Sequence, residues 1–390
     1  MKRMTNLIAV VAVLAAITGC KKKESTPTTG SAGSAATGSS GTGSAAEPVG
    51  TRPSQLPQTP LEKLVLPDDP KRKEKVELGH ALFFDKRLSG ANDRSCYSCH
   101  QNEDGLGGHD PLAIGSGDKK LTRHSPVLWN VGYWKGAFYW DGRAKTLEDN
   151  VKGAWGGGNM GAGPAPAGTP PTPPAPEKVT EALDKKAAEL AKIPGYKKLF
   201  DAAFPGTPVK AEQVQSALAE YMRTIVCADT AFDKYAAGDK SALTEQQQRG
   251  LDLFLSPAKG NCIMCHAPPT FSTAMMIDGG AFFNVGIGTK DVPEDKVDVG
   301  RMKVTNNPAD WAAFKVPSLR NVTKSPPYFH DGSVAKLEDA VKLMASGGIP
   351  NKNKFPQLDD RKLSDAELAD LIAFLGALEC PGKLEEPKLP

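Results

Sequence analysis

The sequence predicts a mostly α-helical protein with two domains in tandem, preceded by a disordered tether. Helix start signals and apolar stripes recur along the folded part, and we find no convincing run of residues alternating as in strands. The series of short motifs in the first half also returns in the second half. A chain of 390 residues is long enough for two ordinary domains.

The N-terminus is typical of a bacterial export signal. Two basic residues precede an apolar run at Leu7–Ile17, which is too short for a stable membrane span. The sequence Ile17-Thr18-Gly19-Cys20 follows the pattern of a lipobox, whose cysteine is lipidated; an ordinary secretory signal with a chance cysteine is the alternative. We therefore expect a lipoprotein signal peptide at 1–20 and a periplasmic protein anchored to a membrane through Cys20. Lys21 favours the outer membrane over the inner one.

Residues 21–60 are predicted to form a flexible tether. The segment is rich in Gly, Ser, Ala and Thr, a composition that cannot bury a core. Forty such residues have an r.m.s. reach of roughly 35 Å. The whole chain has a formal charge of only +3, so we expect no nucleic-acid partner.

The helices of the folded part, which begins near Leu61, are marked by capping boxes and apolar stripes. Capping boxes are formed by Thr244 with Gln247 and by Ser364 with Glu367. A stripe at helical spacing is interpreted as core and consists of Val214, Leu218, Tyr221, Met222 and Ile225. The segment 153–176 has 14 Gly or Pro in 24 positions, which predicts a surface loop.

Three motifs occur twice in the same order. Each half has a Cys-x-x-Cys-His motif, then a Pro…Asn-Val element (126–131 and 317–322). Each then has Asp-Gly followed by Leu-Glu-Asp-x-Val-Lys (147–152 and 337–342). Two tandem copies of one domain plan are the simplest explanation. We place the N-terminal domain at 61–226 and the C-terminal domain at 227–390.

The two Cys-x-x-Cys-His motifs are typical of c-type haem attachment. They consist of Cys96, Cys99 and His100 in the first half and of Cys262, Cys265 and His266 in the second. Two thiols three residues apart can reach one porphyrin edge, and the following imidazole can bind the iron. Structural zinc and a disulfide within each motif are the alternatives; zinc is disfavoured because paired motifs in zinc ribbons lie much closer than Cys99 and Cys262 and because both histidines would be unexplained. The sequence predicts two covalently bound haem c groups.

The repeat predicts that the two haems differ in their second axial ligand. Met344 lies three residues after Val341 on a probable helix, and its counterpart in the first half is Ala154. A thioether opposite His266 would give a low-spin, electron-transferring haem. Ala154 cannot bind iron, so the first haem would be open or differently ligated. A core methionine is the alternative interpretation of Met344.

Two further features concern Trp140 and the remaining cysteines. The repeat pairs Trp140 with His330, each directly before Asp-Gly. A tryptophan between two redox centres can relay electrons, whereas a packed aromatic residue is the alternative. Cys227 and Cys380 lie outside the haem motifs and could form a disulfide in an oxidising compartment.

Four longer motifs carry a family resemblance. They are LFFDKRLS at 82–89, WDGRA at 140–144, FKVPSLRNV at 314–322 and PYFHDG at 327–332. Together with the haem motifs, they cover the chain from about Leu78 to Leu378. They resemble the bacterial di-haem cytochrome c peroxidase family, which also contains the methylamine-utilisation di-haem oxidases.

The resemblance implies two cytochrome-c-like haem domains that reduce hydrogen peroxide to water. His266 and Met344 would hold the haem at which electrons enter from a small cytochrome c or a copper protein. His100 would hold the peroxide-reacting haem, and Trp140 would lie between the two. Homodimers are common in the family, so a homodimer is a further expectation.

The chain departs from the family pattern at its peroxide site. Ser116 stands where many members place a removable distal histidine, so the first haem would be open or capped by another group such as His109 or Met160. Asn159 stands where an acidic catalytic residue precedes a methionine. An amide cannot move a proton between the peroxide oxygens, a role typically worth roughly 10²–10⁴-fold.

Substitutes for that acid, and the family's calcium ion, depend on residues near 110–125. His109, Asp110 or His124 would have to replace the carboxylate. The calcium ion would be bound partly by backbone carbonyls matching Ser325 and Pro327. Its asparagine ligand corresponds to His124, and imidazole is a poor calcium ligand, which argues against calcium here.

Three functions remain open at this point. A peroxidase is the main hypothesis, because the resemblance is long and Ala154 and Met344 differ. An oxidase of the methylamine-utilisation type is favoured by Ser116 and disfavoured by Met344, where those relatives tend to carry tyrosine. A non-enzymatic electron-transfer protein is suggested by Asn159 and would have two six-coordinate, low-spin irons.

Overall fold

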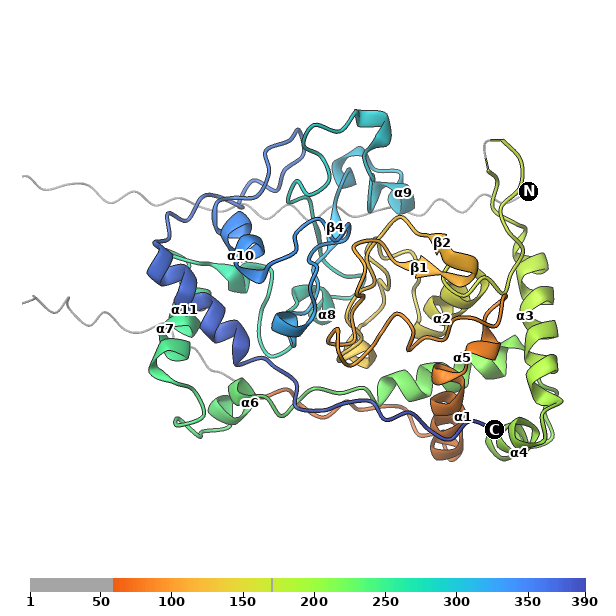
Figure 1. Cartoon of the computed structure of the whole chain (residues 1–390). Helices are drawn as coiled ribbons and strands as arrows, with labels where there is room; N and C mark the ends of the chain where they lie inside the picture. Colours follow the sequence, from red (N-terminus) through yellow and green to blue (C-terminus); the bar gives the residue numbers. More distant parts are fainter. Residues whose placement is uncertain (1–58, 170) are drawn as a thin grey trace, which may run out of the picture. The chain divides into compact units, whose positions relative to one another are not determined.

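The computed structural model describes residues 59–169 and 171–390, and the fold there is mostly helical, as predicted (Figure 1). The predicted signal peptide 1–20, Cys20 and nearly all of the tether lie outside the described residues. Within the described part, no helix has the length and apolar character needed to cross a bilayer.

The elements follow one another in two helical groups. The α-helices are α1 (Arg72–Phe84), α2 (Leu147–Gly156), α3 (Pro176–Ala191), α4 (Pro194–Ala203), α5 (Ala211–Arg223), α6 (Ala231–Ala236), α7 (Glu245–Leu255), α8 (Thr273–Met276), α9 (Met302–Thr305), α10 (Leu337–Ala345) and α11 (Asp365–Gly376). Antiparallel two-residue strands pair β1 (Ile114–Gly115) with β2 (Lys119–Lys120) and β3 (Phe282–Phe283) with β4 (Phe314–Lys315). Short 3₁₀ turns cover 86–88, 116–118, 131–133, 262–264, 294–296, 308–310 and 322–324.

Each helical group is built on one close helix crossing. In the first, α1 packs on α5, and a Cβ added to Gly79 would lie 2.0 Å from the Ala217 carbonyl oxygen. In the second, α7 packs on α11, and a Cβ added to Gly250 would lie 2.0 Å from the Asp370 carbonyl oxygen. Glycine is therefore required at both crossings, because any side chain would force the helices apart. The two crossings are the structural counterpart of the internal repeat.

Two apolar cores surround these crossings. The first runs from Leu78 to Cys227 and includes the predicted stripe on α5, which is buried. The second runs from Phe232 to Leu378 and is rich in phenylalanine, with Phe254, Phe271 and Phe374 packed at ring distances of 5.2–6.1 Å. Both predicted capping boxes are present, at the starts of α7 and α11.

The Gly/Pro-rich segment is shorter than the predicted loop 153–176. Helix α2 continues through Gly153 to Gly156, and α3 starts at Pro176. Trp155 is buried and donates a hydrogen bond from its indole nitrogen to the Leu88 carbonyl (2.9 Å), which holds this last turn against the core. Proline suits the first turn of α3, where its missing N–H costs nothing.

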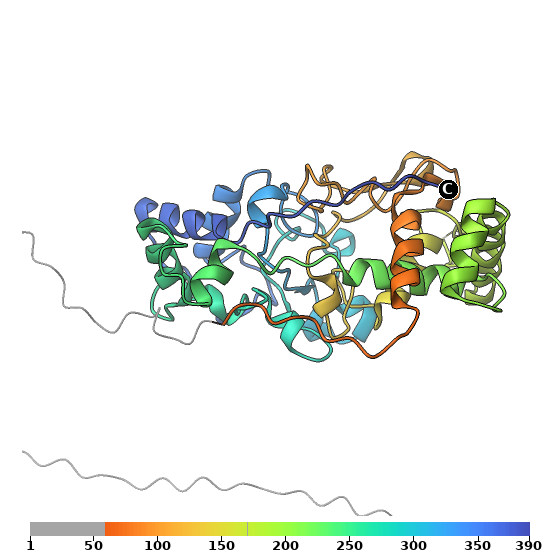
Figure 2. The same cartoon turned by 90° about the horizontal axis from the view of Figure 1, so that it is seen from below.

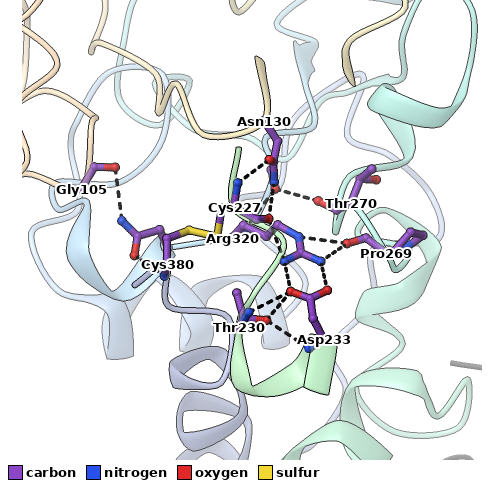
Figure 3. The surroundings of a disulfide bond; sticks show 11 residues. Gly105, Asn130, Cys227, Thr230, Asp233, Pro269, Thr270, Arg320 and Cys380 are labelled. Carbon is purple, nitrogen blue, oxygen red and sulfur yellow. Dashed lines mark hydrogen bonds and ion pairs between the residues drawn. A yellow bond between two sulfur atoms is a disulfide. The ribbon is translucent and has the colours of Figure 1, made fainter. Parts of the chain in front are cut away.

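A disulfide joins the two ends of the second helical group, before α6 and after α11 (Figure 3). Cys227 and Cys380 are bonded, with a Cα–Cα distance of 5.4 Å. The repeat-related Asn130 and Asn321 each hold one half of this bridge: Asn130 bonds the Cys227 amide and carbonyl, and Asn321 accepts from the Cys380 amide. The chain then runs back along the first group, where Arg87 donates to the Pro390 carbonyl (Figures 1 and 2).

Candidate redox site

The first Cys-x-x-Cys-His motif lies directly after α1 and faces a large cavity. The Tyr97 amide donates to the Phe83 carbonyl, which fixes the motif to the end of α1. The cavity has a volume of about 1010 Å³ and is lined by both thiols, Cys96 and Cys99, and by His100. Ala154 of α2 also lines it, as predicted from the repeat.

The second Cys-x-x-Cys-His motif also lines a cavity, which is smaller. The cavity of about 250 Å³ is lined by Cys262, Cys265 and His266. Met344 of α10 lines the same cavity, where Ala154 lines the first one. The structure thus brings both predicted axial residues of the second site to one cavity, and leaves only a methyl group at the matching place in the first.

The two histidines are oriented in the same way. His100 Nδ1 lies 3.0 Å from the Leu106 carbonyl oxygen, and His266 Nδ1 lies 3.1 Å from the Phe271 carbonyl oxygen. A carbonyl can only accept, so Nδ1 carries the proton and Nε2 keeps its lone pair. Burial lowers the pKa of both rings to about 4, so both are neutral at pH 7. A neutral, oriented imidazole is the form that binds iron.

The residues around both cavities fit a haem group. All four motif cysteines are free thiols, and burial raises the pKa of Cys96 and Cys262 to about 12. In the described part of the chain, no cluster of three or more His, Cys, Asp or Glu side chains could hold a bare metal ion, which argues against structural zinc. Each cavity instead has two thiols, one oriented imidazole and mostly apolar walls.

Trp140 lines both cavities and a third one between them. It is buried, and its indole nitrogen donates to the His124 carbonyl at 2.8 Å. The repeat-related His330 lines only the second of the two large cavities, where it stacks on Phe314 with ring centroids 3.5 Å apart. Of this pair, Trp140 therefore has the position that a relay between the two sites needs.

The two halves exchange matching backbone hydrogen bonds beside Trp140. The Lys315 amide donates to the Trp140 carbonyl (2.8 Å), and the His124 amide donates to the His330 carbonyl (2.7 Å). Lys315 and His124 are themselves repeat-related, since each lies two residues before the proline of its Pro…Asn-Val element. The bonds therefore cross between halves in both directions and fix the relative position of the two cavities.

The structure shows which of the residues considered for the peroxide site line the first cavity. Asn159 and Met160 both line it, and the Asn159 carbonyl accepts from the Ser116 amide. Ser116 itself is outside the lining, where its hydroxyl donates to Asp93 (2.6 Å). His109 is 81% exposed, lies beside Asp104 and does not line the cavity, so it is in no position to cap the first site.

His124 is the one proposed substitute acid that lines the first cavity, since Asp110 is exposed. Its Nδ1 donates to the Asp110 carbonyl at 2.9 Å, and burial lowers its pKa. The buried His124 and the two residues whose carbonyls were expected near a calcium ion, Ser325 and Pro327, all line the small cavity between the halves.

Sequence reasoning missed Arg123 and Lys315. Arg123 lines the first cavity and binds Asp298 of the second half through two hydrogen bonds (2.6 and 2.8 Å) as well as Asp141 (2.7 Å). Burial by itself would raise the pKa of Asp298, but the hydrogen bonds and charge of Arg123 outweigh it and lower the pKa. Lys315 lines the second cavity. Its equivalence with His124 in the repeat was the signal that could have identified it.

The fold and these sites define a c-type cytochrome with two haem sites that share one tryptophan. A family model described as "Di-haem cytochrome c peroxidase" matches residues 73–241. The chain is 35% identical to the methylamine utilization protein MauG of Methylorubrum extorquens, over 83% of each chain. It is 33% identical to the cytochrome c551 peroxidase of Pseudomonas aeruginosa, over 85% of this chain and 86% of the relative.

A solved structure agrees with these sequence relatives. A MauG-like protein associated with microbial copper homeostasis has a TM-score of 0.68 and 27% identity, covering 85% of this chain and 96% of that one. This protein belongs to the di-haem cytochrome c peroxidase family, a family of haem-dependent oxidoreductases.

Proposed function

We propose that this protein reduces hydrogen peroxide to water with electrons from a small redox protein, a cytochrome c or a copper protein. The observation that carries the proposal is that one buried tryptophan, Trp140, lies in the walls of both cavities, which have Met344 and Ala154 at their repeat-related positions. One hydrogen peroxide, two electrons and two protons give two waters: the oxygen–oxygen bond breaks and two O–H bonds form.

Each cavity is proposed to hold one covalently attached haem. Cys96 and Cys99 would form the thioethers of the first haem, and Cys262 and Cys265 those of the second. When bound, the two haem irons supply the electrons for splitting the peroxide bond. The chain's own contribution is to hold, orient and shield these groups. The proposal requires no calcium ion, because His124 corresponds to the expected asparagine ligand and imidazole is a poor calcium ligand.

The two sites are proposed to have different roles because Met344 in the second cavity can bind iron, whereas its counterpart in the first cavity, Ala154, cannot. Met344 and His266 both line the second cavity. They would bind the second haem iron on its two sides, so this haem would be closed to peroxide and would receive electrons. Ala154 cannot bind iron, and we propose that Met160, which lines the same cavity, does not cap the first haem, so that peroxide can reach it. Trp140 would pass electrons from the second site to the first.

At the first site, Asn159 is proposed to bind peroxide rather than to transfer its proton. The amide nitrogen can donate a hydrogen bond and the amide oxygen can accept one, but neither takes up a proton near pH 7. Turnover would therefore be slower than with a carboxylate at this position. His124 lines the same cavity, and its ring, with Nδ1 bonded to the Asp110 carbonyl, is proposed to accept that proton.

The expected location also stays a proposal. The export signal and Cys20 support a lipid-anchored periplasmic protein, on the outer rather than the inner membrane, with residues 21–60 as tether. Such a position would give the folded part access to soluble electron donors. A homodimer rests on the family resemblance.

The test compares haem-loaded wild type with Ala154→Met. Wild type should oxidise reduced cytochrome c when peroxide is added, with two cytochromes oxidised per peroxide. Ala154→Met places a thioether in the first cavity and should abolish most of this activity while the spectrum of the second haem stays unchanged. Ala182→Met on α3, which lies outside the cavity lining, is the matched control. A wild type that consumes no peroxide would refute the proposal.

A second candidate function is an oxidase that removes electrons from a protein partner. The 35% identity to MauG of Methylorubrum extorquens favours it. In that case peroxide would be consumed without a reduced cytochrome, and the electrons would come from side chains of the partner. Peroxide consumption measured with and without the reduced donor distinguishes the two functions.

A further inference from the structure

Lys315 is a buried cation at the junction of the two halves. It is the last residue of β4, is 9% exposed, and lines both the second cavity and the small cavity of about 120 Å³ between the halves. Its amide is bonded to Trp140, and its Nζ lies 3.2 Å from the centroid of the Trp134 ring. The ammonium group thus lies over the Trp134 ring, and the backbone of the same residue is bonded to Trp140.

No carboxylate balances this charge among the described residues. Neither the second cavity nor the small cavity has an Asp or Glu in its lining. The acidic residue whose charge acts on Lys315 is Asp141, which is already bonded to Arg123 and Arg143. Burial lowers the pKa of Lys315 to about 7, against the opposing effect of Asp141.

Two other cations inside the fold, Arg320 and Arg123, have carboxylate partners. Arg320 is fully buried and binds both carboxylate oxygens of Asp233 at 2.7 Å. Arg123 binds two carboxylates, Asp141 and Asp298. Lys315 has no such carboxylate, and because an unpaired buried charge is costly, an anion carried by the cavity's occupant would stabilise its ammonium group.

A c-type haem carries two anionic propionates at the porphyrin edge opposite its thioether bonds. Arg361, the other basic residue in the second cavity, lies near the thioether end, since its charge acts on Cys262. Lys315 lies where the second half meets the first, and its amide donates to the Trp140 carbonyl there. The aliphatic stem of a lysine can cross an apolar wall and present its ammonium group to a carboxylate.

We propose that Lys315 forms the ion pair with a propionate of the second haem and thereby raises the reduction potential of that haem. Neutralising a propionate removes a negative charge that would favour the oxidised iron. Lys315 is thus a positioning residue that also sets the driving force for electron flow past Trp140. The inference rests on the proposed covalent haem at Cys262 and Cys265.

The test is an optical redox titration of the haem-loaded protein. Lys315→Met should shift the second haem toward the oxidised form by about tenfold in the equilibrium constant for reduction, which is 59 mV for one electron. Lys315→Arg keeps the charge and should retain most of the wild-type potential. Lys290→Met, at an exposed position in the same half, should leave both potentials unchanged. Haem content is measured for each variant, and Lys315→Gln replaces Lys315→Met if the latter does not load haem.

The outcomes separate this inference from the proposed function. Unchanged potentials in a fully loaded Lys315→Met would overturn the ion pair, whether or not wild type reduces peroxide. A negative shift confined to the second haem would support it, even in a protein that turns out not to be a peroxidase. An equal shift of both haems would also overturn it, because Lys315 lines only the second of the two large cavities.

Discussion

Replacing Asp233 by asparagine should destabilise the protein strongly, because it leaves a buried arginine without its counter-charge. The Arg320 guanidinium is fully buried and forms two 2.7 Å bonds to the two Asp233 carboxylate oxygens (Figure 3). Its other partners are the carbonyls of Pro269 and Cys227, which carry no net charge. The Asp233 carboxylate also caps α6 through Thr230.

The size of the effect follows from this geometry. Removing one partner of a buried ion pair typically costs about 3–5 kcal/mol, because the remaining charge stays out of water. Asparagine keeps the shape, but its NH₂ group would face a guanidinium that can only donate. We expect the loss for Asp233→Asn to lie in this range, while Asp278→Asn, at an exposed position, should cost less than about 0.5 kcal/mol.

Urea unfolding of the haem-loaded protein, followed by far-ultraviolet circular dichroism, measures the loss. With a slope of about 1–3 kcal/mol per M, the midpoint should fall by about 1 M or more. The double variant Arg320→Leu with Asp233→Leu should recover much of the loss, since no charge is then left buried. A midpoint for Asp233→Asn equal to that of Asp278→Asn would refute the reasoning.

The same pair predicts a pH dependence. Burial would raise the pKa of Asp233, but the hydrogen bonds and charge of Arg320 outweigh it and lower the pKa. The stabilisation is therefore fully present above the unfolded value of about 3.9 and is lost as the pH falls through the lower folded pKa. Wild type should lose stability more steeply than Asp233→Asn below about pH 4.

Three further predictions concern the proposed site, and a fourth concerns the disulfide. Asn159→Glu should raise peroxide turnover by about 10²–10⁴-fold because it supplies a proton carrier; stopped-flow kinetics against Asn159→Gln checks this, and equal rates would contradict it. Met344→Ala should convert the second haem from low to high spin, visible by electron paramagnetic resonance. Trp140→Phe should slow reoxidation of the second haem by peroxide without changing its spectrum. Replacing Cys227 and Cys380 by serine should cost about 2–5 kcal/mol in urea, because a bridge across 153 residues strongly restricts the unfolded chain.

Local signals in the sequence were sufficient to predict the starts of α7 and α11. The capping boxes at Thr244 and Ser364 involve residues three positions apart, so no distant contact decides them. The end of α2 was misjudged, because the glycines from 153 onward argue for a loop while the buried Trp155 keeps the helix in place. A tertiary contact outweighed composition there.

The site was predictable where the repeat applied and not elsewhere. Ala154 and Met344 were compared because their helices begin with the same six-residue motif, and both line the cavities. Lys315 and Arg123 look like surface cations in sequence. Their burial depends on contacts between the halves, through Trp140 and Asp298, that no local pattern encodes.

The disulfide has a consequence for how the protein matures. Cys380 is encoded after all four cysteines of the haem motifs, so its bond to Cys227 can form only once both motifs have been made. An oxidant able to form that bond could also join Cys96 to Cys99 or Cys262 to Cys265, which would block thioether formation. The proposed haem attachment would therefore require two pairs of thiols to stay reduced in a molecule whose third pair is oxidised. Expression strains would need haem-attachment and thiol-reducing factors together with disulfide formation, and the proportion of each would limit the yield of mature protein.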